Sequence, residues 1–145
     1  MSILYQISYD LSIDYFKLFP LILHIILYLC YVIFCPKYRR KILVNGVDDR
    51  VKELFYEYQS DFGYDVLDLE VIPDHIHALL DIPPTKNISK LIGNIKGKMA
   101  HQLRQDFPYL KSRLPSVWTR SYFVSSVGSV TLELVKKYIE NQKIK

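Results

Sequence analysis

The chain has 145 residues, half of them hydrophobic, and a formal net charge of +4 at pH 7. This length fits one domain with its own core, and this composition excludes a disordered tail. The basic balance suits a polyanionic partner such as nucleic acid, although many ordinary basic proteins share it. Because Cys30 and Cys35 have no zinc-like spacing, we interpret them as reduced thiols of a cytoplasmic protein.

A long apolar run extends from Leu21 to Cys35 and includes His24. It is shorter than the span of about 17 residues that a membrane helix requires, and residues 1–20 lack the features of a signal peptide. We therefore expect no membrane partner, and we interpret the run as a buried strand over residues 24–34. Residues 1–23 stay unassigned, and residues 24–145 form the predicted single domain.

Helical and strand patterns alternate after this first strand. We predict a helix over 47–63 that stops at Gly63, strands over 66–72 and 75–82, a helix over 88–107, a strand over 118–125 and a final helix over 129–145. This order predicts an α+β fold of the ferredoxin-like, split β-α-β class, in which an antiparallel sheet has its helices on one side.

Two histidines, His75 and His77, lie two residues apart in a predicted strand, so their side chains emerge on one face. Two neighbouring imidazoles can bind one divalent cation, although a solvated pair on a hairpin would have the same spacing. Asp74, just before the pair, either orients a histidine or serves only as a turn residue.

The final helix carries Tyr138 and, one turn later on the same side, Gln142. A tyrosine hydroxyl attacks a phosphate only when a metal or nearby cations stabilise the phenolate. Because the chain has 12 tyrosines, spacing alone does not single out Tyr138.

Basic and aromatic side chains could contact nucleic acid. The aromatic candidates for stacking on bases are Tyr38, Tyr122, Trp118 and Phe123, and we expect the last two in the core. The lysines of the second helix fit a solvated face equally well. The residues predicted to contact DNA are Lys37, Arg39, Arg40, Lys90, Lys96, Lys98 and Arg120.

Five segments occur in a fixed order: CPKYRRKIL, PDHIHALLDIPP, ISKLIGNIKGK, VWTRSYFVSSVG and KKYIENQ. From about Tyr31 to its end, the chain thereby resembles the single-strand, one-tyrosine HUH transposases of small insertion sequences, the TnpA type. Residues 1–23 fit no part of that pattern, and Met99 and Ala100 stand where relatives often have a small hydroxyl residue.

The resemblance implies a site and a reaction. It implies Mg²⁺ or Mn²⁺ held by His75, His77 and Gln142, and Tyr138 as a nucleophile that forms a 5′-phosphotyrosine link. It also implies single-stranded DNA with hairpin element ends as the substrate, and a homodimer. The helix bearing Tyr138 then completes either the active site of its own chain or that of the partner.

Three alternatives remain open. The first is a domesticated relative that processes chromosomal repeats with the same chemistry. The second is a non-catalytic module that binds single-stranded nucleic acid, and the third is a two-histidine phosphoesterase with no covalent intermediate.

Overall fold

The computed structural model describes residues 3–128 and 130–144 of the chain. Its helices and strands, in chain order, are α1 (Ile3–Leu11), α2 (Tyr15–Tyr28), β1 (Leu29–Phe34), the short 3-10 helix η1 (Lys37–Arg39), α3 (Val47–Phe62), β2 (Asp65–Ile72), β3 (His75–Asp81), α4 (Ile88–Asp106), α5 (Tyr109–Arg113), β4 (Phe123–Ser126) and α6 (Leu132–Ile144).

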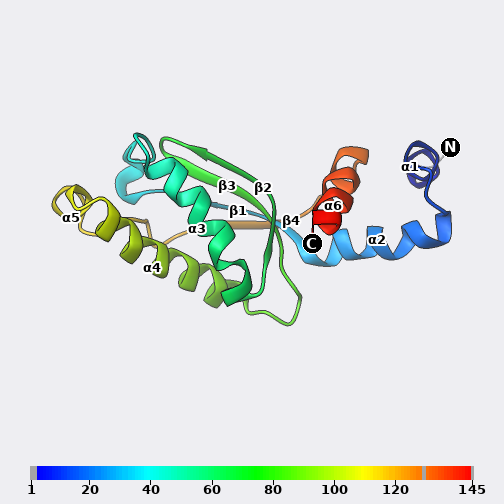
Figure 1. The fold of residues 1–145 in the computed structure, drawn as a ribbon. Coiled ribbons are helices and arrows are strands. Elements are labelled where there is room, and N and C mark those ends of the chain that lie inside the picture. The colour runs from blue at the N-terminus through cyan, green and yellow to red at the C-terminus, as the bar shows by residue number, and fades with distance from the viewer. Residues whose placement is uncertain (1–2, 129, 145) are drawn as a thin grey trace.

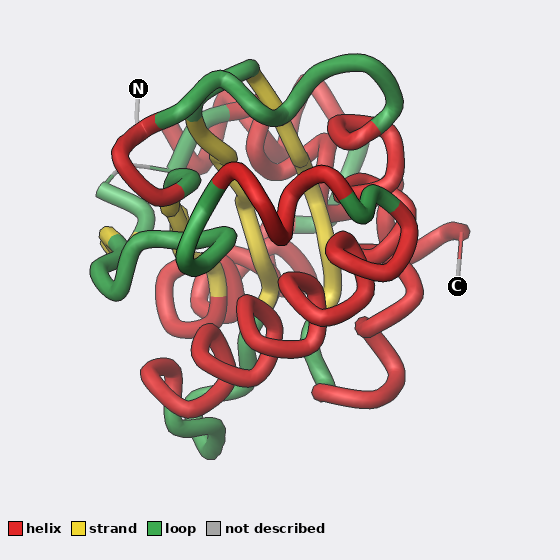
Figure 2. Tube along the Cα trace, turned by 90° about the vertical axis from the view of Figure 1, so that its left-hand side faces the viewer, coloured by secondary structure: helices red, strands yellow, loops and turns green. Residues whose placement is uncertain are grey.

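The four strands form one antiparallel sheet in the order β2-β3-β1-β4. They lie side by side in Figure 2. The β2–β3 hairpin supplies one half of the sheet, and the short β4 pairs with the other edge of β1. The predicted α+β fold with an antiparallel sheet is therefore confirmed.

Helices α3 and α4 cover one face of this sheet (Figure 1). Alternate strand residues, such as Val32, Ile76 and Leu80, point into the core beneath them and are buried. Helix α3 ends at Gly63, as predicted, because this residue adopts a left-handed conformation (φ 72°) that glycine tolerates without a steric penalty. This packing leaves the odd-numbered residues of β3 on the opposite face.

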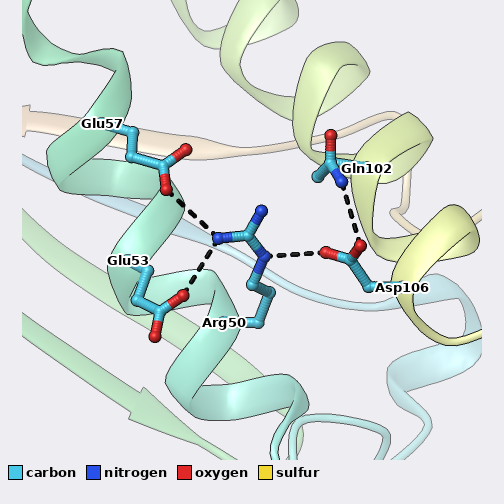
Figure 3. Close-up of polar contacts among 5 residues, drawn as sticks. All are labelled: Arg50, Glu53, Glu57, Gln102 and Asp106. Atoms are coloured by element: carbon cyan, nitrogen blue, oxygen red, sulfur yellow. Dashed lines mark hydrogen bonds and ion pairs between the residues drawn. The ribbon is translucent and has the colours of Figure 1, made fainter.

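A charged cluster on the surface joins α3 to α4 (Figure 3). Arg50 donates from Nε to Asp106 at 2.7 Å and from one terminal nitrogen to Glu53 and Glu57 at 3.0 and 3.2 Å. Gln102 donates to the second oxygen of Asp106 at 3.0 Å. The hydrogen bond from Arg50 is the main reason that the pKa of Asp106 lies below its usual range.

A second apolar cluster forms at one end of the opposite face, where α6 lies beside α2 (Figure 1). Leu18 and Ile25 of α2, Leu79 of β3, and Val135 and Tyr138 of α6 are buried together there. The terminal helix is thus on the other side of the sheet from α3 and α4.

The predicted strand over 24–34 is wrong in its first part, because residues 24–28 belong to α2 and only Leu29–Phe34 form β1. Asp14 caps the start of α2, since its side chain accepts a hydrogen bond from the backbone of Phe16 at 3.0 Å. Its apolar residues surround the whole helix, so their pattern does not distinguish it from a strand buried on both faces.

Two further boundaries differ from the prediction, namely the start of β4 and the start of the final helix, which begins at Leu132. Residues 129 and 145 of that predicted helix lie outside the described residues. The segment 118–125 forms a strand only from Phe123, and Trp118 makes an isolated bridge to Pro36. The five-residue helix α5 was not predicted. Among the described residues no single helix has the length and hydropathy of a membrane span; Tyr5–Leu11 and Phe16–Tyr28 would pass only together, as a pair bent by 111°.

Candidate active site

The two histidines lie on the open face of the sheet, at the start of β3. His77 pairs with Glu70 of β2 and with Ile33 of β1, and its ring stacks on Tyr31 with 5.4 Å between centroids. His75 shares this face because it is two residues away on the same strand. The structure therefore places both imidazoles on one face of β3, as the spacing predicts.

His75 is oriented by a short chain of polar contacts. Its Nδ1 is 3.0 Å from one oxygen of Asp74, whose other oxygen accepts a hydrogen bond from Arg39 at 3.1 Å. The hydrogen bond from His75 is the main reason that the pKa of Asp74 lies below its usual range, and the charge of Arg39 acts in the same direction. With Nδ1–H donating to the carboxylate, the Nε2 lone pair of His75 is free to bind a metal.

These side chains supply two nitrogen ligands. Within residues 3–128 and 130–144, no group of three His, Cys, Asp or Glu side chains is placed to hold a metal ion. A cation at His75 and His77 would therefore complete its coordination with amide, phosphate or water oxygens. This requirement agrees with the amide of Gln142 that the family resemblance implies.

Tyr138 lies at the other end of the sheet from the histidines. Its ring is 5.0 Å from the ring of His24, whose Nε2 contacts Asp81 at 2.9 Å. Asp81 is the last residue of β3, and His77 lies four residues before it, a separation of about 13 Å along a strand. Within one chain of this conformation, the phenol and the imidazole pair do not converge.

The position of Tyr138 disfavours a nucleophile. The residue is only 6% exposed, and burial, followed by the charge of Asp81, raises its pKa. Its hydroxyl therefore keeps its proton more firmly than a solvated tyrosine does. Sequence patterns gave no signal for this cover, because His24 and Ile25 lie in the segment assigned to a strand, and Leu18 and Ile22 lie in residues 1–23, which stayed unassigned.

Polar contacts hold α6 against the edge of the sheet, but one buried polar group of this helix has no hydrogen-bond partner. Lys137 forms an ion pair with Asp68 of β2 at 2.6 Å, and this hydrogen bond raises the pKa of Lys137. The Nδ2 of Asn141 is buried without a hydrogen-bond partner, which costs about 1–3 kcal/mol. Gln142 is exposed to solvent.

The residues predicted to contact DNA fall into three groups. Arg39, Arg40 and Lys37 follow β1, near the histidines, and the first two are exposed. Lys90 and Arg120 are also exposed, on α4 and on the segment before β4. The four exposed positions leave their charges accessible to a phosphate backbone, whereas Lys37 is half-buried.

Lys98 and Lys96 of α4 differ from each other. Lys98 is exposed and forms an ion pair with Asp61 at 3.0 Å. Lys96 is buried, and its ammonium donates to the carbonyl oxygens of Thr119 and Ser121 at 2.6 and 3.1 Å. Burial lowers the pKa of Lys96. The prediction that Lys96 contacts DNA is not supported, because its amine is committed to backbone carbonyls.

The aromatic residues predicted to stack on bases also differ in their exposure. Trp118 is buried, as expected, and its indole nitrogen donates to the carbonyl of Lys96 at 3.1 Å. Phe123 was expected in the core, but 57% of it is exposed, because β4 is an edge strand and Phe123 points to the open face. Tyr38 and Tyr122 are exposed.

Comparison with known proteins places the chain in a family. Residues 25–142 match the family model described as "Transposase IS200 like". The chain is 34% identical to the ISDra2 transposase TnpA of Deinococcus radiodurans over 77% of this chain and 81% of that protein. It is 32% identical to the transposase for insertion sequence element IS200 of Salmonella typhimurium, over 77% and 74% of the two chains.

Solved structures agree with these matches. A crystal structure of a Deinococcus radiodurans protein assigned as a transposase aligns with a TM-score of 0.65 and 33% identity, over 79% of this chain and 89% of that one. A REP-associated tyrosine transposase bound to a REP hairpin shares the fold alone, with a TM-score of 0.55 and 15% identity over 79% and 61%. The chain therefore belongs to the IS200-like transposase family.

Proposed function

We propose that this transposase cleaves and rejoins single-stranded DNA at the ends of an insertion sequence through a covalent link to Tyr138. The observation that supports the proposal is the oriented pair of imidazoles on the open sheet face, within a chain that matches the family over residues 25–142. Membership of this family favours a transposase over an unrelated binding module.

The proposed metal is Mg²⁺ or Mn²⁺, held by His75, His77 and Gln142 together with a DNA phosphate oxygen. The donor types suit such a cation: His75 is oriented by Asp74, and Gln142, exposed on α6, would join the imidazoles once that helix moves. When bound, such a cation polarises the phosphate as a Lewis acid. Arg39 and Arg40 are close enough along the chain to hold neighbouring phosphates.

In the proposed reaction, the oxygen of Tyr138 attacks a phosphodiester and loses its proton. The bond from phosphorus to the 3′ oxygen breaks, and the leaving 3′ oxygen takes up a proton. The products are a 5′-phosphotyrosine link and a free 3′-hydroxyl. A 3′-hydroxyl of another strand end then attacks the same phosphorus and releases Tyr138, so the energy of the phosphodiester is conserved.

This reaction requires α6 to leave its pocket beside α2, because Tyr138 is buried near the end of β3, where Asp81 lies about 13 Å along the strand from His77. The unsatisfied amide of Asn141 lowers the stability of the docked helix. We include in the proposal a homodimer in which α6 of one subunit serves the histidines of the other. Because a transposase of the same fold was solved with a REP hairpin, we also propose hairpin ends as the DNA partner.

The experiment is covalent capture. Purified chain is incubated with labelled single-stranded DNA from either side of its gene and Mg²⁺ or Mn²⁺, and adducts are separated on a denaturing gel. We expect adducts from the wild type and from Tyr56→Phe, a control in an exposed tyrosine of α3. Tyr138→Phe, His75→Ala, His77→Ala and a chelator should each abolish them. Adducts that persist in Tyr138→Phe would refute the nucleophile.

A further inference from the structure

A hollow of about 430 Å³ opens on the same sheet face as the histidines, where β1 ends and β4 begins. Its lining includes Ile33, Arg39, His75, Ser121, Tyr122 and Phe123. One wall thus belongs to the proposed active site, and the facing wall is aromatic. The proposed cleavage reaction gives the aromatic wall no role.

The strand register fixes how the hollow lies relative to the metal ligands. Ile33 of β1 pairs with His77 on one side and with Phe123 on the other. His77, Ile33 and Phe123 therefore form one row across three strands, and Phe123 is two strand spacings, about 10 Å, from His77. This separation is comparable with the length of one nucleotide. A phosphate held at His77 would therefore leave its base near Phe123.

The aromatic wall is open to solvent, because β4 is an edge strand and Phe123 points to the open face. Phe123 is 57% exposed and Tyr122 37% exposed, although they are neighbours beside a concave surface. Unpaired bases stack on such side chains, because every base has a flat apolar face. Arg39 and Ser121 add hydrogen-bonding groups at the rim.

The wall is also preformed. Lys96 donates to the carbonyls of Thr119 and Ser121, and its ammonium lies 5.9 Å from the centre of the Tyr122 ring. On the other side, Tyr38 and Arg39 both adopt positive φ angles, 59° and 50°, which non-glycine residues rarely adopt. Such strained backbone concentrates at binding sites, and here it carries the arginine at the rim.

We propose that this hollow binds one unpaired DNA base, stacked on Phe123 and Tyr122, whose own phosphate or the next one lies at His75 and His77. This inference rests on the proposed function, because it takes single-stranded DNA as the substrate. It assigns to the segment before β4 the task of setting which nucleotide reaches the metal ligands.

The test measures DNA affinity rather than cleavage. Single-stranded DNA from either side of the gene is prepared as a series in which each oligonucleotide lacks one base, and binding is measured in a Tyr138→Phe background. Because base stacking on an aromatic side chain is typically strong, Phe123→Ala should weaken binding of the intact DNA about tenfold or more. Phe123→Tyr should restore the affinity, and Tyr56→Ala, an exposed aromatic on α3, should change nothing.

The series identifies the base. For one abasic position, Phe123→Ala should cause no further loss, because the stacking partner is already missing. Equal affinities of Phe123→Ala and its parent for intact DNA would overturn the proposal, and so would a loss that is the same for every abasic oligonucleotide. Covalent capture by the wild type tests the proposed function separately. If adducts form but Phe123→Ala leaves DNA affinity unchanged, only the base site is refuted. If Phe123→Ala causes a base-specific loss of affinity but no adducts form, only the cleavage chemistry is refuted.

Discussion

Lys96 and Lys98 lie two residues apart on α4, yet the structure gives them different tasks. We consider replacing each by methionine, which keeps an apolar stem of similar length and removes the charge. The Lys96 ammonium is buried and makes two hydrogen bonds to carbonyl oxygens at 2.6 and 3.1 Å. The Lys98 ammonium is at the surface, 3.0 Å from Asp61 and 4.6 Å from the centre of the Tyr58 ring.

The expected costs follow from these contacts. A hydrogen bond to a charged group contributes about 1.5–3 kcal/mol, and each carbonyl left buried without a partner costs about 1–3 kcal/mol. The cost of burying the ammonium offsets part of the stabilisation that these hydrogen bonds give, and the same burial lowers the pKa of Lys96. We expect Lys96→Met to reduce the free energy of unfolding by about 2–4 kcal/mol. An exposed ion pair contributes at most about 1 kcal/mol, so Lys98→Met should cost about that or less.

Urea denaturation followed by circular dichroism measures both values under the same conditions. Lys96→Met should also weaken binding of single-stranded DNA, because the loop that carries Tyr122 loses its anchor, whereas Lys98→Met should affect binding only at low salt. Equal and small losses of stability in the two variants would refute the assignment of Lys96 as a structural anchor.

Three further predictions concern other parts of the molecule. Asp74→Asn should weaken Mn²⁺ binding about 10- to 100-fold, measured by calorimetry, whereas Asp61→Asn should not. Because burial raises the pKa of Tyr138, its contribution to the free energy of unfolding is fully present below the ordinary tyrosine pKa of about 10. This contribution is lost as the pH rises above that value. Tyr138→Phe should therefore lose less stability than the wild type between pH 8 and about 11; equal losses would contradict the burial. Arg50→Met should lower the urea midpoint, and the difference from the wild type should be smaller at high salt. A difference in midpoint that salt does not change would argue against the ion pairs with Asp106 and the two glutamates.

The local sequence pattern was sufficient to predict most of the sheet. The period of two placed His75 and His77 on one face, and burial alternates in the same way over the first four residues of β3, His75–Ala78. The helical spacing of α3 and its glycine stop gave bounds within one residue of the observed Val47–Phe62. These features depend on residues close together in the sequence, so the sequence alone is enough to predict them.

Features that depend on packing between distant segments were not predictable in this way. Whether Tyr138 is accessible depends on α2, whose apolar surface resembles a buried strand in sequence. The burial of Lys96 depends on carbonyls more than twenty residues away, and the exposure of Phe123 depends on β4 being an edge strand. A hydrophobic or charged residue type does not specify which neighbour covers it.

The most direct test of the central claim is the distance from a bound Mn²⁺ to α6. A nitroxide label is placed at Lys136, an exposed position on that helix, in a chain whose two cysteines are replaced, and pulsed electron paramagnetic resonance measures the distance. The account predicts one longer distance without DNA and a shorter one when single-stranded element ends bind, with both signals lost in a His75→Ala, His77→Ala variant. An unchanged distance while Tyr138 adducts accumulate would contradict it.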